Sequence, residues 1–338
     1  MGSVTKTYNP TIVKMQTVGI LFVVVGHMFP ELRNSREMPL VPQVIYTWIF
    51  SFHMYFFMFI SGVLFFWTNS RRRFSYLATV VGKVRRLLLP FVVLSSVAFI
   101  PKCALSGFAY RGLELTHITF FKMFYIPAYN PVVYFWFLQA LFLIFLTSFS
   151  LLYFSKKNIL ILALVSIVLF LLPFLINFNE DIFSVNKAIK FIFYFWAGMI
   201  AARYRSNGKF CGNPSVIFLA VIVTWGVVYI RYTFDVPQKY SLLLEPIASF
   251  SGIVMCIGIA HRWATVKKDP FTYIDGFSYQ IYLLSWFFSV FFRIPYQMGI
   301  YNFYIASFLR LFAALFFPVI IARIAVKYKT FLNPAIGL

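Results

Sequence analysis

Long apolar runs separated by short polar or basic segments dominate this chain. A transmembrane α-helix needs about 20 predominantly apolar residues to cross a hydrocarbon core of roughly 30 Å. Runs of about that length cover residues 11–30, 44–67, 87–105, 132–154, 159–178, 187–202, 215–234, 242–260, 274–292 and 301–326. The pattern therefore predicts an all-α integral membrane protein, a bundle of about ten transmembrane helices.

The segments between the apolar runs are short. The longest outer loop is expected at 106–131, and the sequence shows no Pro/Gly/Ser-rich linker and no internal repeat. We therefore expect a single membrane-embedded domain over residues 1–338. The first run has no small-residue cleavage site after it, so it is expected to be a retained helix rather than a signal peptide.

Composition agrees with this pattern. Hydrophobic residues make up 61% of the chain, charged residues 12%, and the mean hydropathy is +0.82. These values exclude an ordinary soluble globular domain. The 45 Phe and 21 Tyr residues suit helices that face acyl chains and aromatic rings that anchor at the membrane interfaces.

The formal charge of +21 is distributed unevenly between the two ends of the predicted bundle. Most Lys and Arg residues lie near residue 6, at 71–86, 156–157, 203–209, 262–268 and 323–329. These are alternate connecting segments, and both chain ends belong to the same set. Because Lys and Arg resist translocation, both termini are predicted cytoplasmic. The positive charge thus indicates the orientation of the chain in the membrane, and no nucleic acid partner is predicted.

The three cysteines, Cys103, Cys211 and Cys256, form no CxxC pair and have no histidine at ligand spacing. Neither a disulfide nor a structural zinc is expected, and no metal site is predicted.

Two histidines fall inside predicted spans, where an ionisable side chain is costly and needs a reason. His27 ends the stretch Gly-Ile-Leu-Phe-Val-Val-Val-Gly-His, and His53 follows Phe52 in the next span. Consecutive spans joined by a short loop are antiparallel neighbours, so we expect both imidazoles in one cavity. An imidazole there can take a proton from an attacking hydroxyl. A packed histidine bonded to a backbone carbonyl is the alternative, and the residues alone leave both open.

A second feature is the basic stretch Lys-Val-Arg-Arg-Leu-Leu-Leu-Pro at 83–90. Lys83, Arg85 and Arg86 are expected to end a cytoplasmic loop at the start of a helix, where cations hold phosphate groups. An acyl-CoA, with its phosphates and thioester, would fit such a site. The positive-inside tendency of membrane proteins explains the same charges without a ligand.

Weaker candidates complete the set. Glu31 follows His27 by four residues, a spacing that permits pairing on one helical face, although a solvated carboxylate at the interface is the ordinary alternative. Trp136 and Tyr279 are candidates for stacking against a sugar, or for packing in an aromatic belt.

Three arginines, Arg231, Arg293 and Arg310, lie near outer span ends. They would line an acceptor cavity or extend to the interface, and the second is the more ordinary behaviour of arginine in a membrane protein.

Five segments in order carry a family resemblance. They are 19–27, Phe-His-Met-Tyr-Phe-Phe-Met-Phe-Ile-Ser-Gly at 52–62, the basic stretch 83–90, Tyr-Phe-Trp-Phe-Leu at 134–138, and Ser-Tyr-Gln-Ile-Tyr-Leu-Leu-Ser at 278–285. Their order and spacing resemble the acyltransferase family 3 membrane proteins. The Phe-His-Met variant is most similar to the branch with fucose 4-O-acetylases and capsular or exopolysaccharide O-acetyltransferases.

The resemblance implies transfer of an acyl group, usually acetyl, from cytoplasmic acyl-CoA to a hydroxyl of a cell-surface glycan or its lipid-linked precursor. It implies a multi-pass protein of the cell membrane, the bacterial inner or plasma membrane, and makes His27 the essential histidine. Two positions depart from the family pattern. Gln16 occupies the position of a basic residue, for which Lys14 is the nearest substitute, and Ser285 replaces a late histidine.

The resulting hypothesis assigns a role to each candidate. Lys83, Arg85 and Arg86 hold the donor phosphates, with Lys14 as a further cofactor-binding candidate. His27 deprotonates the acceptor hydroxyl, and His53 is the first candidate to hold the oxyanion. A transporter or flippase for a lipid-linked saccharide and a scaffold subunit of a polysaccharide machine are the alternatives. The sequence predicts no oligomeric state.

Overall fold

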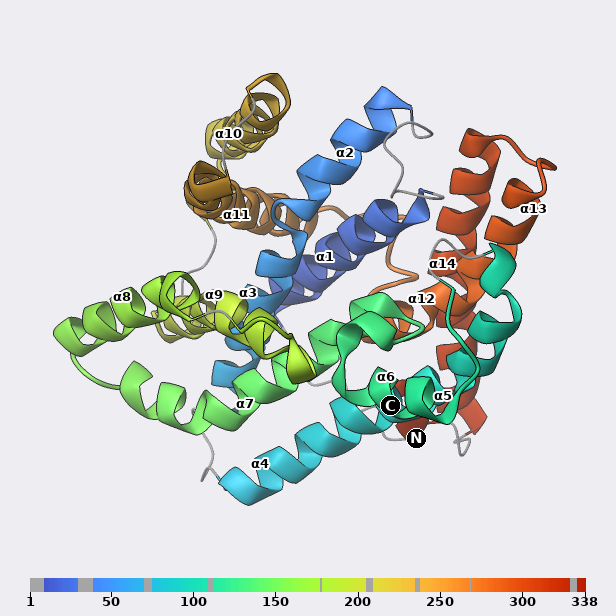
Figure 1. The fold of residues 1–338 in the computed structure, drawn as a ribbon. Helices are drawn as coiled ribbons and strands as arrows, with labels where there is room; N and C mark the ends of the chain where they lie inside the picture. Colours follow the sequence, from blue (N-terminus) through green and yellow to red (C-terminus); the bar gives the residue numbers. More distant parts are fainter. Residues whose placement is uncertain are drawn as a thin grey trace.

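The structure is a computed structural model that describes residues 9–29, 39–69, 75–108, 112–176, 178–204, 209–234, 238–267, 269–328 and 333–338. Regular secondary structure in these ranges is entirely helical (Figure 1). The first half contains α1 (Pro10–Met28), α2 (Leu40–Phe50), α3 (His53–Asn69), α4 (Tyr76–Lys83), α5 (Leu89–Ala104), α6 (His117–Tyr125) and α7 (Trp136–Ser155). The all-α prediction is confirmed.

The second half is also helical. It contains α8 (Ile159–Leu175), α9 (Val185–Arg203), α10 (Pro214–Thr233), α11 (Gln238–Trp263), α12 (Ser278–Ser289), α13 (Arg293–Gln297) and α14 (Phe303–Tyr328). A π-helical segment, η1 (Val84–Leu88), joins α4 to α5. Short 3₁₀ turns lie at Ser106–Phe108, Pro127–Tyr129, Val133–Phe135, Ile182–Ser184, Val290–Phe292 and Pro334–Ile336.

Several helices begin where the sequence supplies a cap. Asn9, Asn158 and Asn213 each accept a hydrogen bond from a backbone N–H in the first turn of α1, α8 and α10, at 3.0 Å in every case. Pro10 and Pro214 occupy the first position of their helices, where a missing N–H costs nothing. These caps define the helix starts from local chemistry alone.

Seven helical segments of the described ranges are long and apolar enough to cross a membrane. They are Pro10–Met28, Leu40–Asn69, Tyr76–Ala104, Val133–Ser155, Pro214–Thr233, Leu243–Trp263 and Phe303–Tyr328. The other three predicted spans are present as α8, α9 and α12, but α8 has 17 residues, α12 has 12, and α9 carries two lysines and an arginine. The count of ten spans and the cytoplasmic termini therefore stay predictions.

The centre of the bundle is formed by α1 and α3. Helix α3 packs along α9, and α1 is in contact with α11, α12 and α14, so that α1 lies between the two sides of the fold (Figure 1). Buried apolar residues from α1 through α14 form one large cluster. The histidines of the first two spans are thereby carried into the middle of the molecule.

The contact between α3 and α9 depends on two glycines that face each other's backbone. A Cβ on Gly62 would lie 1.9 Å from the carbonyl oxygen of Phe195, and one on Gly198 would lie 2.0 Å from that of Phe59. No side chain fits at such distances. Small residues that let two helices approach closely are a usual device of membrane bundles.

Two membrane segments are interrupted at motifs that carry the family resemblance. The predicted continuous span 44–67 is divided at Ser51 and Phe52 into α2 and α3, and Phe52 packs against Gly252 of α11. The sequence analysis placed the basic stretch at the end of a loop before a helix, and this prediction is wrong. It lies within the helical segment 76–104, where the backbone widens into the π-helix η1, a feature often found at functional sites.

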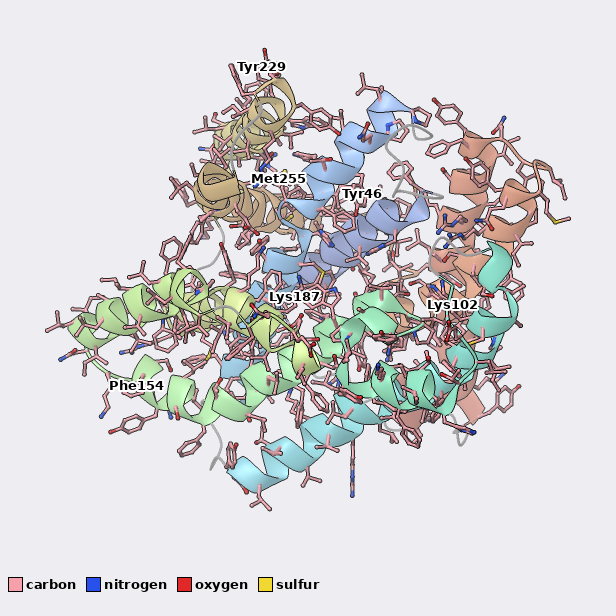
Figure 2. All side chains as sticks on the ribbon, in the orientation of Figure 1. Tyr46, Lys102, Phe154, Lys187, Tyr229 and Met255 are labelled. Atoms are coloured by element: carbon pink, nitrogen blue, oxygen red, sulfur yellow. The ribbon has the colours of Figure 1, made fainter. Side chains whose placement is uncertain are left out.

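The outer surface of the bundle is apolar. Tyr229 of α10 is 65% exposed and Phe154 of α7 is 38% exposed, and both extend away from the fold, whereas Met255 of α11 is 1% exposed (Figure 2). A large exposed apolar surface is stable only where lipid replaces water. Together with the seven apolar helices, it defines a multi-pass membrane protein.

Replacement of Gly62 by Ala is expected to destabilise the protein by about 1–3 kcal/mol, because the added methyl group forces α3 and α9 apart. Gly226→Ala is the matched control, since nothing lies within 4 Å of a Cβ at that position of α10. Thermal unfolding of each purified protein in nanodiscs measures the effect. Equal stability of the two variants would contradict the close approach of these helices.

Candidate active site

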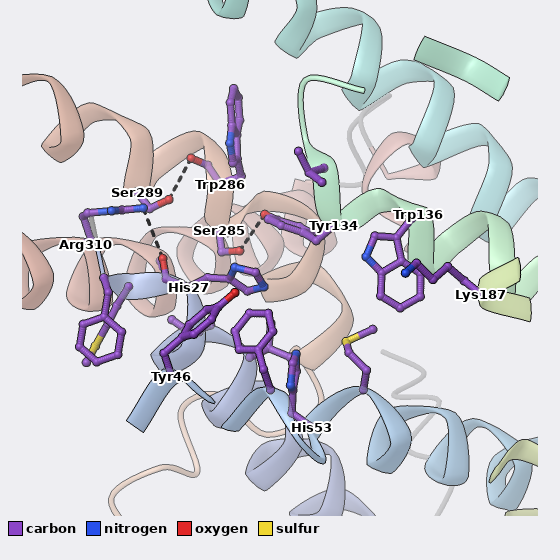
Figure 3. Close-up of a pocket in the computed structure, with 18 of the residues that line it drawn as sticks. His27, Tyr46, His53, Tyr134, Trp136, Lys187, Ser285, Trp286, Ser289 and Arg310 are labelled. Atoms are coloured by element: carbon purple, nitrogen blue, oxygen red, sulfur yellow. Dashed lines mark hydrogen bonds between the residues drawn. The ribbon is translucent and has the colours of Figure 1, made fainter. Parts of the chain in front are cut away.

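A cavity of about 540 Å³ lies where α1 ends. Its wall is built from the last turns of α1, the α2–α3 junction, the segment 131–136, and parts of α5, α9, α11, α12, α13 and α14 (Figure 3). His27 and His53 both line it. The expectation that the two imidazoles share one cavity is therefore confirmed, whereas their chemical roles are not tested by the geometry.

His27 lies in the last turn of α1 with its ring inside the cavity. Its ring centroid is 5.2 Å from that of Phe50 and 5.2 Å from that of Tyr134. The backbone carbonyl of His27 accepts a hydrogen bond of 3.3 Å from Nη2 of Arg310 on α14. This carbonyl belongs to the unpaired end of a helix, so Arg310 satisfies it and ties the histidine turn to α14.

His53 is the first residue of α3 and is 1% exposed. Its Nδ1 is 2.9 Å from the carbonyl oxygen of Ile49, the bond expected of a packed histidine. A carbonyl only accepts, so this contact assigns a proton to Nδ1, and the neutral ring keeps Nε2 as an acceptor. Holding an oxyanion at Nε2 would then require the doubly protonated ring. The ring centroids of His27 and His53 are 6.5 Å apart.

A pair of hydroxyl groups lies beside His27 in the cavity. The Tyr134 hydroxyl is 3.3 Å from Oγ of Ser285, and both residues line the cavity (Figure 3). The Tyr282 hydroxyl donates to the backbone carbonyl of Tyr134 at 2.7 Å and holds this segment in place. Ser285, the position that departs from the family pattern, thus contributes a hydroxyl beside the central histidine.

Among the described residues, five cationic side chains and one carboxylate line the cavity, and the sequence analysis named two of the five cations. The cations are Lys102 of α5, Lys187 and Lys190 of α9, Arg293 of α13 and Arg310 of α14. The carboxylate, Glu245 of α11, forms an ion pair with Lys190. The expectation that outer arginines extend to the interface is wrong for Arg310, which is 9% exposed and points inward. Of the lysines that the sequence analysis missed, Lys102 lies at the end of one predicted apolar run, and Lys187 and Lys190 lie at the start of another. Their place at outer span ends was the signal that could have found them.

Trp136, the predicted sugar-binding aromatic, lines the same cavity. One face of its ring stacks on Phe191, with centroids 5.5 Å apart and planes inclined by 16°. The Lys187 ammonium lies 5.7 Å from the Trp136 centroid. The packing fixes the orientation of the indole at the cavity wall.

The basic cluster, Lys83, Arg85 and Arg86, lies apart from the cavity. Lys83 is half-buried with its ammonium 3.7 Å from the Phe145 ring centroid, whereas Arg85 and Arg86 are exposed. The Arg86 guanidinium is 5.6 Å from the centroid of the Tyr279 ring. The backbone carbonyl of Arg86 accepts a hydrogen bond from the Tyr279 hydroxyl. Tyr279 therefore belongs to the basic cluster and does not line the cavity of His27.

Lys14 is buried and engaged by protein carboxylates. It forms ion pairs with Asp269 and Asp275 of the segment before α12, and the Thr17 hydroxyl donates to Asp275 at 2.6 Å. Burial alone would raise the pKa of Asp269, but hydrogen bonds, foremost that from Lys14, outweigh it and lower this pKa below its ordinary value. The structure thus gives Lys14 a role in joining α1 to this segment, and phosphate binding by Lys14 stays a prediction. Glu31 lies outside the described residues.

A row of three tyrosines connects the two candidate regions. Tyr279, beneath Arg86, stacks on Tyr282 with centroids 6.5 Å apart. Tyr282 is 5.4 Å from Tyr134, whose ring is the neighbour of His27 at 5.2 Å. We call Tyr279, Tyr282 and Tyr134 the tyrosine row. It makes the basic cluster and the histidine cavity parts of one continuous arrangement.

Fold and site together define a multi-pass helical membrane protein with a histidine-lined cavity inside the bundle and a basic cluster on a widened helix. Residues 15–326 match the sequence profile of acyltransferase family 3, described as an acyltransferase domain. The match covers most of the chain, and the protein belongs to this family of acyltransferases. Comparisons with curated proteins and with solved structures give no match.

The Lys14 contacts generate a stability prediction. Lys14→Gln leaves two largely buried carboxylates without their cation, which is expected to cost about 3 kcal/mol of stability, the lower end of the cost of breaking a buried pair. Lys156→Gln, at an exposed position after α7, should change little. Adding Asp269→Asn and Asp275→Asn to Lys14→Gln should restore part of the loss.

The experiment is thermal unfolding in nanodiscs at pH 7. Because the folded-state pKa of Asp269 is lowered, its stabilising contribution is complete above its ordinary pKa and is lost only as the pH falls through the lowered value. A Lys14→Gln protein of unchanged stability but weakened acyl-CoA binding would instead assign Lys14 to the donor site.

Proposed function

We propose that this protein is a membrane O-acyltransferase that moves an acyl group, acetyl in the first instance, from cytoplasmic acyl-CoA to a hydroxyl of a cell-surface polysaccharide or its lipid-linked precursor. The observation that carries the proposal is that His27 lines a cavity between the helices of a protein that belongs to an acyltransferase family. The membrane would be the bacterial inner or plasma membrane, with both termini cytoplasmic.

The proposed reaction begins with proton transfer to an imidazole. His27 takes the proton of the acceptor hydroxyl as its oxygen attacks the thioester carbonyl carbon. The new C–O bond forms, and the carbonyl oxygen becomes an oxyanion. The tetrahedral intermediate then collapses with cleavage of the C–S bond, and the imidazolium returns its proton to the leaving CoA sulfur.

The oxyanion needs hydrogen-bond donors in place before it forms. His53 was the first candidate, but its Nδ1 contact with Ile49 leaves a neutral ring with an acceptor at Nε2. The hydroxyls of Tyr134 and Ser285 face the cavity beside His27 and are donors without any change of charge. We therefore assign the oxyanion to this pair, and give His53 the role of orienting His27 or the acceptor hydroxyl.

The donor is proposed to bind at the opposite end of the tyrosine row. Exposed Arg85 and Arg86 offer planar guanidinium groups to phosphate oxygens, and Lys83 lies one residue before the π-helix. The pantetheine arm would follow Tyr279 and the rest of the row toward His27. Acyl-CoA is thus a co-substrate that arrives from the predicted cytoplasmic face.

His27→Ala is expected to lower acetyl transfer at least about 100-fold, the lower end of what a general base contributes. His117→Ala is the matched control, because His117 lies on the exposed first turn of α6 and does not line the cavity. The measurement is transfer of labelled acetyl from acetyl-CoA to a crude surface glycan by protein in nanodiscs. Normal acetyl transfer by the His27→Ala protein would refute the mechanism. If the wild-type protein consumes no acyl-CoA, the saccharide transporter becomes the better hypothesis.

Arg86→Gln is expected to raise the KM for acetyl-CoA about tenfold with a smaller change in kcat, since a charge-assisted hydrogen bond to phosphate is worth about 1.5–3 kcal/mol. Arg323→Gln is its control. Arg323 also lies over a tyrosine, 4.5 Å from the Tyr273 centroid, at the same predicted face. Steady-state kinetics with varied acetyl-CoA decide the matter, and equal KM values for both variants would remove Arg86 from the donor site.

A further inference from the structure

Among the described residues that line the cavity, cations outnumber carboxylates, at the end of the bundle where topology predicts few cations. The cations come from four helices and line the same cavity; they are Lys102, Lys187, Lys190, Arg293 and Arg310. Among the described lining residues the one carboxylate is that of Glu245. All five belong to the predicted outer ends of spans. The positive-inside tendency, which accounts for the basic cluster at the opposite face, therefore does not account for them.

An ionisable group placed within a membrane protein requires a partner or a function. Glu245 is engaged by Lys190 through an ion pair. Lys187 forms no ion pair within the described part of the chain, and its ammonium is beside the Trp136 ring at the cavity wall (Figure 3). The cavity thus presents a cation next to an aromatic surface, in the same space as His27.

We infer that the acceptor is an anionic saccharide, one that carries a carboxylate or a phosphate near the hydroxyl that is acylated. This inference rests on the proposed acyl transfer and names the class of acceptor. Cations lining a low-dielectric cavity concentrate and orient an anion more strongly than they would in water. Lys187 binds the anionic group, and Trp136 contacts the sugar ring.

The position of the cations explains how charge recognition would serve the reaction. The anionic group, held at the cavity wall by Lys187, fixes one end of the saccharide. Its hydroxyl then extends toward His27 and the Tyr134–Ser285 pair on the other side of the same cavity. Binding energy from a part of the substrate that does not react is thereby used to orient the hydroxyl that does.

The test measures binding without acyl-CoA, in nanodiscs of zwitterionic lipid. Three probes are compared: a uronic acid oligosaccharide, a neutral oligosaccharide of equal length, and a neutral disaccharide linked to polyprenyl diphosphate. The variants are Lys187→Gln and its matched control Lys122→Gln. Lys122 is also half-buried at an outer segment and also lies over an aromatic ring, 5.2 Å from the Tyr129 centroid, but it does not line the cavity.

The expected result is that at least one anionic probe binds more tightly than the neutral oligosaccharide, and that Lys187→Gln weakens its binding about tenfold while Lys122→Gln does not. The uronic acid probe reports a carboxylate acceptor and the diphosphate probe a lipid-linked one. Lys187→Arg, which keeps the charge, should retain binding. It guards against a folding defect in the glutamine variant.

Equal binding of neutral and anionic probes, or identical binding by the Lys187→Gln and Lys122→Gln proteins, would overturn the inference. Because acyl-CoA is left out, these outcomes are independent of catalysis. Failure of acyl transfer is detected separately by acetyl-CoA consumption in the wild-type and His27→Ala proteins. Acyl transfer without anion selectivity would refute this inference and keep the proposed function.

Discussion

The cost of removing charge from water governs both ends of this structure. At one end, Lys14 is buried and is neutralised by Asp269 and Asp275, which ties the start of α1 to the segment before α12. At the other end, Lys190 pairs with Glu245 at the wall of a cavity, and Lys187 forms no ion pair within the described part of the chain. The first arrangement is a closed cluster, whereas the second leaves the Lys187 ammonium at the cavity wall. This contrast distinguishes the cluster that joins helices from the region proposed to bind a ligand.

Local departures from α-helical geometry position the residues of both candidate regions. The break at Ser51 and Phe52 starts a new helix at His53 and lets its imidazole use the Ile49 carbonyl. The π-helix η1 presents Arg86 over Tyr279, whose hydroxyl in turn satisfies a carbonyl of the widened turn. Regular helices would satisfy their own backbone groups and would leave none for these side chains.

Much of this arrangement could be predicted from the sequence, since the bilayer restricts what an apolar chain can form. Long apolar runs predicted the all-helical class. The short loop between the first two spans predicted that His27 and His53 share a cavity, and the order of the motifs indicated the family. What failed depended on tertiary contacts. Hydropathy does not report a π-turn inside a continuous helix, so the basic stretch was expected in a loop. Hydropathy also does not report which way the Arg310 side chain points, because α14 is apolar on the side that faces lipid as well as on the side that faces the bundle.

The tyrosine row has a consequence for the membrane itself. An enzyme that takes its donor from one side and its acceptor from the other needs openings at both ends, and a continuous water path between them would conduct ions. Tyr282, in the middle of the row, is only 6% exposed and packs against rings on both sides. In the proposed reaction the tyrosine row lies between the donor end and the acceptor end of the bundle. Its packed rings would narrow the path between them to one that the pantetheine arm fills, which would limit ion leakage during acyl transfer.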